Sequence, residues 1–170
     1  PFGFLFYLYF YNRKPPKPRP MKKKDIKILL VDDEPDILEI VGYNLSQEGY
    51  QIITANNGKE AVAKAKKELP HLIIMDVMMP EMDGMEACEN IRKIPELKNV
   101  IITFLTARSE DYSQVAGFDA GADDYITKPI KPKLLISKVK ALLRRLKEEE
   151  SSNSETLNVG GIEINREEYK

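Results

Sequence analysis

The chain has 170 residues, of which 42% are hydrophobic and 31% charged, with a formal net charge of −1. This length suffices for one ordinary domain with flanking segments, and a near-neutral chain has no overall attraction to nucleic acid. The single cysteine, Cys88, excludes an internal disulfide and gives no reason to place the chain outside the reducing cytoplasm. The single histidine, His71, excludes a metal site built from several histidines and is assigned no role.

The first 20 residues differ in composition from the rest. Residues 1–11 are aromatic and apolar, and residues 12–20 are basic and proline-rich. The apolar run is shorter than the roughly 20 residues that span a bilayer, and it lacks the basic lead-in of a signal peptide. Met21 opens a segment that reads like a natural start. We therefore expect residues 1–20 to be a non-native or disordered leader; the alternative is a peripheral membrane or partner-binding tail.

From Asp25 onward, apolar runs of strand length alternate with segments of helical periodicity. The runs are continuous rather than alternating, as in strands buried on both faces of a parallel sheet. The pattern predicts an α/β domain over residues 22–148, a five-stranded doubly wound parallel sheet. The expected strands are residues 26–31, 50–54, 71–75, 100–105 and 122–127, and the expected helices are residues 34–48, 58–68, 84–94, 109–119 and 131–149.

The end of the chain has a different character. Residues 149–156 are polar and predict a linker. Residues 157–170 resemble two short strands around a Gly-Gly turn, which cannot form a core alone. We expect them to be the start of a further domain.

Carboxylates follow two of the expected strands. The run "KILLV" leads into Asp32 and Asp33, and "HLIIM" leads into Asp76. Because ligands of parallel α/β sheets bind outside the carboxyl ends of the strands, these acids are expected to converge there. Three such carboxylates repel one another unless a cation lies between them, and oxygen ligands favour Mg²⁺ or Mn²⁺ over zinc. The alternative is that these aspartates only cap the N-termini of the following helices.

Two further strand ends supply a hydroxyl and an ammonium group. Thr106 directly follows the run at 100–105, and Lys128 directly follows the run at 122–127. Mg²⁺ and Lys128 would neutralise phosphoryl oxygens, Thr106 would hydrogen-bond one, and Asp76 would be the nucleophile. The alternatives are a polar strand end for Thr106 and a solvated surface lysine for Lys128.

The motifs "VDDE", "MDVMMPEMDG", "LTA" and "GADDYITKP", in this order over about residues 25–148, resemble the receiver domain of bacterial two-component response regulators. The resemblance implies the flavodoxin-like (βα)5 receiver fold and transfer of a phosphoryl group from a sensor histidine kinase to Asp76. It further implies that Asp33 binds Mg²⁺ directly with Asp32 assisting, and that the backbone carbonyl of Met78 completes the protein ligands.

The same resemblance implies a switch. Thr106 and Tyr125 match the residue pair in which the hydroxyl moves toward the phosphoryl group and the aromatic ring turns inward. Lys128 matches the family's lysine, and the Lys128–Pro129 bond is expected to be cis.

The tail, "LNVGGIEINREEYK", is similar to the first strands of the winged-helix domain of OmpR/PhoB-type regulators. That resemblance implies a truncated effector, DNA binding only through the missing part, and homodimerisation through the fourth helix, fifth strand and fifth helix. The class often has an opposite-charge pair where this chain has Gln114 and Leu134, which puts the chemistry of that face in doubt. Residues that could form ion pairs between subunits are Asp123, Asp124, Lys138 and Arg145.

The sequence therefore predicts a phosphorylation-dependent regulator of transcription, without a membrane partner, that is not an enzyme beyond its own phosphorylation and dephosphorylation. A Mg²⁺-dependent phosphohydrolase is one alternative, although Met78 stands where that class needs a second acid. A nucleotide- or flavin-binding protein is another, but the "DDEPD" loop would repel phosphate. A constitutive scaffold also stays open.

Overall fold

The computed structural model describes residues 22–107, 119–153, 157–159 and 162–164 of the chain. Its centre is a five-stranded parallel sheet with the order β2-β1-β3-β4-β5. The five-stranded α/β prediction is therefore confirmed, and the strand order reverses after β1, as in doubly wound folds. The strands are β1 (Lys27–Val31), β2 (Gln51–Ala55), β3 (Leu72–Asp76), β4 (Ile101–Thr106) and β5 (Asp124–Thr127).

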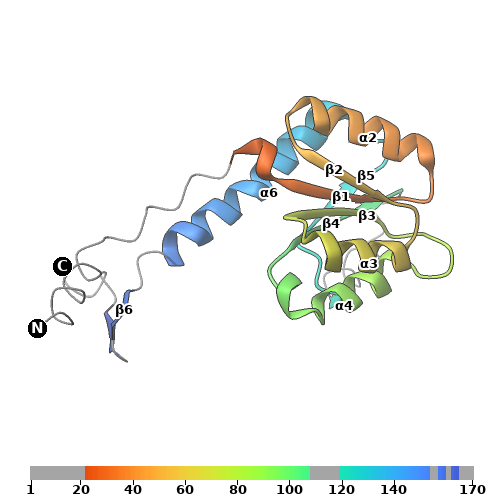
Figure 1. Ribbon diagram of the computed structural model, residues 1–170. Helices are drawn as coiled ribbons and strands as arrows, with labels where there is room; N and C mark the ends of the chain where they lie inside the picture. Colours follow the sequence, from red (N-terminus) through yellow and green to blue (C-terminus); the bar gives the residue numbers. More distant parts are fainter. Residues whose placement is uncertain (1–21, 108–118, 154–156, 160–161, 165–170) are drawn as a thin grey trace, which may run out of the picture.

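Helices cover both faces of this sheet. In Figure 1, α2 and α6 lie on one side of the strands, and α3 and α4 lie on the other. Short 3-10 turns, η1 and η2, precede β1 and β4. The bounds are η1 (Lys23–Asp25), α2 (Pro35–Gln47), α3 (Gly58–Glu68), α4 (Gly84–Arg92), η2 (Pro95–Leu97) and α6 (Pro132–Asn153).

The core is divided by the sheet into two apolar layers. Successive side chains of β1 point to opposite faces, so Ile28 and Leu30 join the layer under α2 and α6, whereas Leu29 and Val31 join the layer under α3 and α4. Burial on both faces explains why the strands read as unbroken apolar runs. Cys88 of α4 lies fully buried in the second layer, as expected of a small apolar side chain.

Side chains cap the N-termini of two helices. Asn57 is the N-cap of α3 and accepts a hydrogen bond from the backbone N–H of Glu60 at 2.9 Å, and Asp83 does the same for Glu86 of α4 at 2.8 Å. In contrast, Glu34 is the N-cap of α2, and its side chain makes no capping hydrogen bond.

The C-terminal part agrees with the expectation from the sequence in its two short strands and differs from it in the length of the last helix. The antiparallel pair β6 (Leu157–Val159) and β7 (Ile162–Ile164) corresponds to the two short strands expected there. Helix α6 continues to Asn153, into the stretch expected to be a linker, and extends away from the sheet in Figure 1. The leader at residues 1–20 lies outside the described residues, as does nearly all of the helix expected at 109–119.

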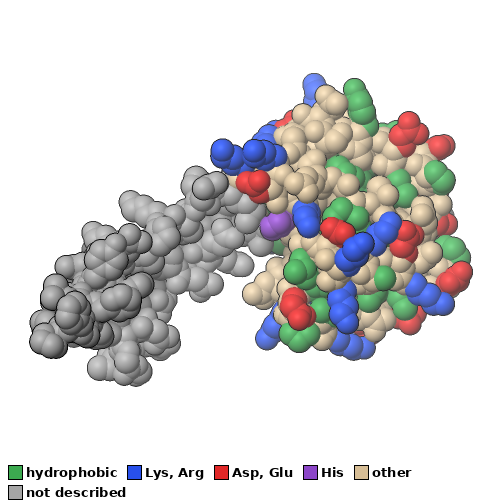
Figure 2. Space-filling model, viewed as in Figure 1, with side chains coloured by type: hydrophobic (Ala, Val, Ile, Leu, Met, Phe, Trp, Pro, Cys, Tyr) green, Lys and Arg blue, Asp and Glu red, His purple; other side chains and the backbone are tan. Residues whose placement is uncertain are grey.

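Figure 2 shows acidic and basic side chains interspersed over the visible face of the domain, consistent with the small net charge. Within the described residues, no helix combines the length and the apolar character needed to cross a membrane.

Candidate functional site

The three acids predicted from the sequence meet at the carboxyl ends of two adjacent strands. Val31 pairs with Met75 in the parallel register of β1 and β3, so Asp32 and Asp76 follow at the same level. Asp33 is the next residue along the chain. Carboxylate oxygens of Asp32, Asp33 and Asp76 all lie within 4.8 Å of one another. The convergence follows from parallel pairing alone, because a parallel sheet ends all its strands at one edge.

Backbone N–H groups hold two of these carboxylates in place. Asp32 Oδ1 accepts a hydrogen bond from the N–H of Glu34 at 2.9 Å, and Asp76 Oδ1 accepts one from the N–H of Met78 at 3.2 Å. The Asp32 residue is only 1% exposed, whereas Asp33 is exposed. Asp32 and Asp76 therefore lie at the buried base of the site, and Asp33 lies where the site meets solvent.

Lys128 brings a positive charge to this group of acids. Its Nζ donates to Asp32 Oδ2 at 2.9 Å, to Asp76 Oδ2 at 3.1 Å and to Glu34 Oε1 at 3.2 Å. Its backbone N–H donates to the carbonyl of Thr106 at 2.7 Å, which fixes the start of this loop to the end of β4. The Lys128–Pro129 peptide bond is cis, as expected.

Burial and charge act against each other on these groups. Burial raises the pKa of the Asp32 carboxyl, and the nearby Asp76 adds to this, while the Glu34 N–H and Lys128 oppose it. Burial by itself lowers the pKa of Lys128, but hydrogen bonds to Asp32 and Asp76 and their charges outweigh it, so the pKa is raised. Lys128 is consequently a fixed cation at neutral pH.

The two residues expected to form a switch lie on neighbouring strands. Thr106 is the last residue of β4, and Tyr125 lies within β5 beside Phe104 in the β4–β5 register. Both side chains are buried, and the Tyr125 ring packs on Phe104 with 5.8 Å between ring centroids. The aromatic ring therefore lies inside the domain.

The donor set fits a hard divalent cation. All three clustered side chains offer carboxylate oxygens, the ligands that Mg²⁺ and Mn²⁺ prefer. Met78 donates its N–H to Asp76, and the residue is 78% exposed. Its carbonyl as a ligand stays a prediction.

Comparison with known proteins settles the family. Residues 28–140 match the response regulator receiver domain. The chain belongs to this family. The receiver domain is 46% identical over 119 residues to the alkaline phosphatase synthesis transcriptional regulatory protein PhoP of Bacillus subtilis, covering 70% of this chain and 49% of that protein.

Further relatives agree. The phosphate regulon transcriptional regulatory protein PhoB of Rhizobium meliloti is 40% identical over 144 residues, covering 85% of this chain and 63% of its own length. Among solved structures, the chemotaxis protein CheY4 of Vibrio cholerae is 34% identical with a TM-score of 0.67, covering 69% of this chain and 98% of its own. The receiver domain thus has the CheY-like flavodoxin fold and PhoP/PhoB-type relatives, and the chain spans about half to two thirds of those two regulators.

One residue at the site of this receiver domain was missed by sequence reasoning. Glu34 contacts Lys128 at 3.2 Å, although only Asp32 and Asp33 of the acidic run were assigned roles. The signal was present, since Glu34 is the third consecutive acid after β1.

Charged residues expected to pair between two receiver domains are already paired within this chain. Asp124 accepts from Lys138 Nζ at 3.2 Å, and Asp123 Oδ2 accepts from Arg92 Nη2 at 2.9 Å. Leu134 is 51% exposed, Arg145 is also exposed, and Gln114 lies outside the described residues. Pairing between subunits through these residues stays a prediction.

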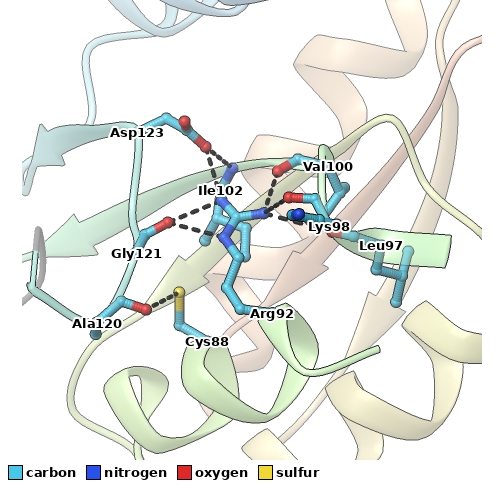
Figure 3. Close-up of polar contacts among 9 residues, drawn as sticks. All are labelled: Cys88, Arg92, Leu97, Lys98, Val100, Ile102, Ala120, Gly121 and Asp123. Atoms are coloured by element: carbon cyan, nitrogen blue, oxygen red, sulfur yellow. Dashed lines mark hydrogen bonds and ion pairs between the residues drawn. The ribbon is translucent and has the colours of Figure 1, made fainter. Parts of the chain in front are cut away.

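Arg92 is a second residue that the sequence did not reveal. Figure 3 shows its guanidinium between α4, the segment before β4 and the segment before β5. It donates to the carbonyls of Gly121 and Val100 as well as to Asp123, which also accepts from the N–H of Ile102 at 2.8 Å. A polar cavity of about 300 Å³ beside it is lined by Arg92, Lys98 and Arg145. Arg92 and Lys98 precede β4, and Gly121 of the same lining precedes β5, so the cavity lies at the opposite edge of the sheet from the acids; Arg145 reaches it from α6.

Proposed function

We propose that the chain is a phosphorylation-dependent switch in which Asp76 accepts a phosphoryl group from a phosphohistidine of a sensor histidine kinase. The observation that carries this proposal is the contact of Lys128 Nζ with Asp76 Oδ2 at 3.1 Å beside two further carboxylates. A nucleophilic carboxylate with a fixed cation beside it is suited to phosphoryl transfer, where catalysis is mainly positioning and neutralisation of charge.

The transfer requires little covalent chemistry from the protein. One Asp76 oxygen attacks phosphorus while the phosphorus–nitrogen bond of the donor breaks, and its electron pair stays on the imidazole nitrogen, which takes up a proton. Lys128 holds one phosphoryl oxygen through its ammonium, and the hydroxyl of Thr106 donates to another. Hydrolysis by water later returns Asp76 to its carboxylate. Beyond these two reactions of its own Asp76, we propose no turnover.

Asp32, Asp33 and Asp76 would hold Mg²⁺, or Mn²⁺ in its place, with Asp33 as a direct ligand, Asp32 assisting and the Met78 carbonyl completing the set. When bound, the cation supplies neutralisation of the charge on the phosphoryl oxygens. The support is the clustering of three carboxylates and the hard character of their oxygens.

The output of the switch would pass through Thr106 and Tyr125 to the face formed by β5 and α6. Phosphorylation adds charge and acceptor oxygens that draw the Thr106 hydroxyl toward Asp76, which biases the packing around Tyr125. We propose that the phosphorylated chain forms a homodimer through this face in the cytoplasm. The proposed output is control of transcription, because the PhoP and PhoB relatives are named transcriptional regulatory proteins. DNA binding would then depend on a winged-helix domain of the kind that residues 157–170 resemble.

The test is intact mass after incubation with Mg²⁺ and acetyl phosphate. We expect a gain of one phosphoryl group, about 80 Da, which is absent from the Asp76→Asn variant and from a sample treated with a chelator. Size-exclusion chromatography of the same samples then reports dimerisation. If the wild-type chain binds Mg²⁺ but gains no mass, the proposal is wrong, and a constitutive scaffold becomes the better reading.

A further inference from the structure

Glu34 has an unusual position for an exposed acid. It is the N-cap residue of α2, but its side chain does not cap that helix. Instead it reaches Lys128 Nζ, 94 residues away in sequence, at 3.2 Å. Its side chain is 62% exposed, in contrast to those of Asp32 and Asp76, which bind the same ammonium and are 1% and 9% exposed.

The contacts of Lys128 leave no hydrogen free for an incoming group. A lysine ammonium has three N–H donors, and in this chain the three go to Asp32, Asp76 and Glu34. A phosphoryl oxygen can therefore bind Lys128 only if one of these contacts is given up. Of the two partners that keep their charge when Asp76 is phosphorylated, Glu34 is the one whose release costs less, because water can solvate its exposed carboxylate, whereas the buried carboxylate of Asp32 would lose its hydrogen bond without replacement.

Repulsion between charges is a second effect by which Glu34 disfavours phosphorylation of Asp76. Glu34 and Asp76 share one ammonium, so the Glu34 carboxylate lies close to any phosphoryl group on Asp76. Like charges at this range repel, and the partly buried surroundings of Lys128 weaken the screening. Glu34 thus stabilises the unphosphorylated arrangement of Lys128 and disfavours the phosphorylated one.

We propose that Glu34 is a positioning residue that restrains Lys128 in the unphosphorylated state and limits the extent of phosphorylation of Asp76. This inference rests on the proposed function of Asp76. It does not make Glu34 a ligand of the cation or of the phosphoryl group; Glu34 acts only through Lys128.

Two substitutions separate the contact from the charge. Glu34→Gln removes the charge and weakens the contact, whereas Glu34→Asp keeps the charge but shortens the side chain by one methylene. The matched control is Glu39→Gln, which removes an exposed acid of α2 that forms no ion pair with any residue the structure describes. The measurements are the phosphorylated fraction at steady state with acetyl phosphate and the rate of its loss after the donor is removed, both by intact mass, with Mg²⁺ affinity by calorimetry.

We expect Glu34→Gln to raise the ratio of phosphorylated to unphosphorylated chain by about two- to five-fold, the range open to an exposed ion pair. Glu34→Asp should raise this ratio by a smaller factor, and Glu39→Gln should leave the ratio unchanged. The inference is overturned if Glu34→Gln matches the wild type, if Glu34→Asp matches the wild type while Glu34→Gln does not, or if Mg²⁺ affinity changes by the same factor as phosphorylation. Wild-type chain that gains no phosphoryl group would instead overturn the proposed function, and this inference with it.

Discussion

Lys128 Nζ lies 3.1 Å from Asp76 Oδ2 and so places a permanent positive charge against the carboxylate proposed to be phosphorylated. The two residues are 52 positions apart and come from the ends of β3 and β5, which flank β4 in the sheet. This ammonium contacts Asp32 and Asp76, two of the three carboxylates that could hold a divalent cation. We therefore expect Lys128 to compete with a cation for these carboxylates and, as proposed above, to assist the phosphoryl group.

The first prediction follows from this competition. Replacing Lys128 by Gln should raise the affinity for Mg²⁺ by about ten-fold, which corresponds to about 1.4 kcal/mol, because a neighbouring positive charge is removed. The same variant should be phosphorylated more slowly than the wild type, because no cation holds the phosphoryl oxygen. Calorimetry gives the affinity, and intact mass over time gives the rate.

Lys131→Gln is the control for Lys128→Gln, because it removes an exposed lysine that follows the same loop. It should change neither quantity by more than about two-fold. A Lys128→Gln variant that binds Mg²⁺ more weakly would show that the ammonium supports the cation site instead of competing with it.

The second prediction concerns Arg92 and Asp123. Arg92→Met should reduce the free energy of unfolding by about 2–3 kcal/mol, since the carbonyls of Gly121 and Val100 lose their donor and Asp123 loses its counter-charge. Urea unfolding of Arg92→Met, Asp123→Asn and the double variant measures how much of this belongs to the pair. We expect a coupling of about 0.5–1.5 kcal/mol, and additive single effects would assign the loss to the carbonyl contacts alone.

The third prediction concerns the pH dependence of stability through Glu48, which follows α2. Its Oε2 lies 2.9 Å from Nζ of both Lys140 in α6 and Lys23 in η1. The hydrogen bond from Lys140, followed by that from Lys23, lowers the pKa of Glu48 below its usual value. A carboxyl with a lowered pKa in the folded state contributes stability that is fully present above its ordinary pKa and lost as the pH falls through the folded value.

Glu48→Gln should accordingly be less stable than the wild type at pH 7, and the difference should shrink as the pH falls below the ordinary pKa of 4.5. Molar salt should shrink it as well at pH 7, because both lysines are exposed and Glu48 is only partly buried. Urea unfolding at pH 7 and at a pH below 4.5 tests this, with Glu39→Gln as the charge-matched control. A difference that persists unchanged at low pH would mean that packing, not charge, accounts for it.

The sheet and the acid cluster were predictable because both follow from local patterns. Continuous apolar runs identify strands buried on both faces, and parallel pairing brings the residues after β1 and β3 to one edge, so Asp32 and Asp76 could be placed together without coordinates. Element ends were less accurate. Ala122 and Asp123 were expected in a strand that begins at Asp124, because an apolar run does not report where hydrogen bonding to the neighbouring strand starts.

The contacts of Glu34 and Arg92 could not be predicted in this way. Glu34 reads as one acid in an acidic run and Arg92 as a solvated residue at a helix end, because nothing nearby in sequence identifies their partners. Those partners are Lys128, 94 residues away, and Gly121 and Asp123, 29 and 31 residues away. Contacts of this kind depend on the final packing of α2 and α4 against the sheet, which periodicity does not specify.

The fourth prediction uses the close approach of α4 to the proposed phosphorylation site. Gly84 is the first residue of α4, and a Cβ at this position would lie 2.2 Å from the backbone oxygen of Asp76. Only a shift of backbone can relieve such a clash, because the obstructing atom belongs to the main chain. Gly84→Ala should therefore move the end of β3 away from α4, which disturbs the placement of Asp76 although Gly84 has no part in the chemistry.

We expect Gly84→Ala to lower the free energy of unfolding by about 2–3 kcal/mol and to slow phosphorylation of Asp76 in whatever fraction stays folded. Gly42→Ala is the matched control. Gly42 lies inside α2, and a Cβ there would meet only side-chain atoms of Ile52 and Leu30, at 3.6 Å. Since this is ordinary contact, replacing a helical glycine by alanine should stabilise the domain by about 0.5–1 kcal/mol and leave phosphorylation unchanged. If the backbone contact at Asp76 decides the outcome, urea unfolding gives changes of opposite sign for the two variants, and intact mass shows slower phosphorylation for Gly84→Ala alone. A stable and fully phosphorylated Gly84→Ala would show that α4 can move without carrying Asp76 with it.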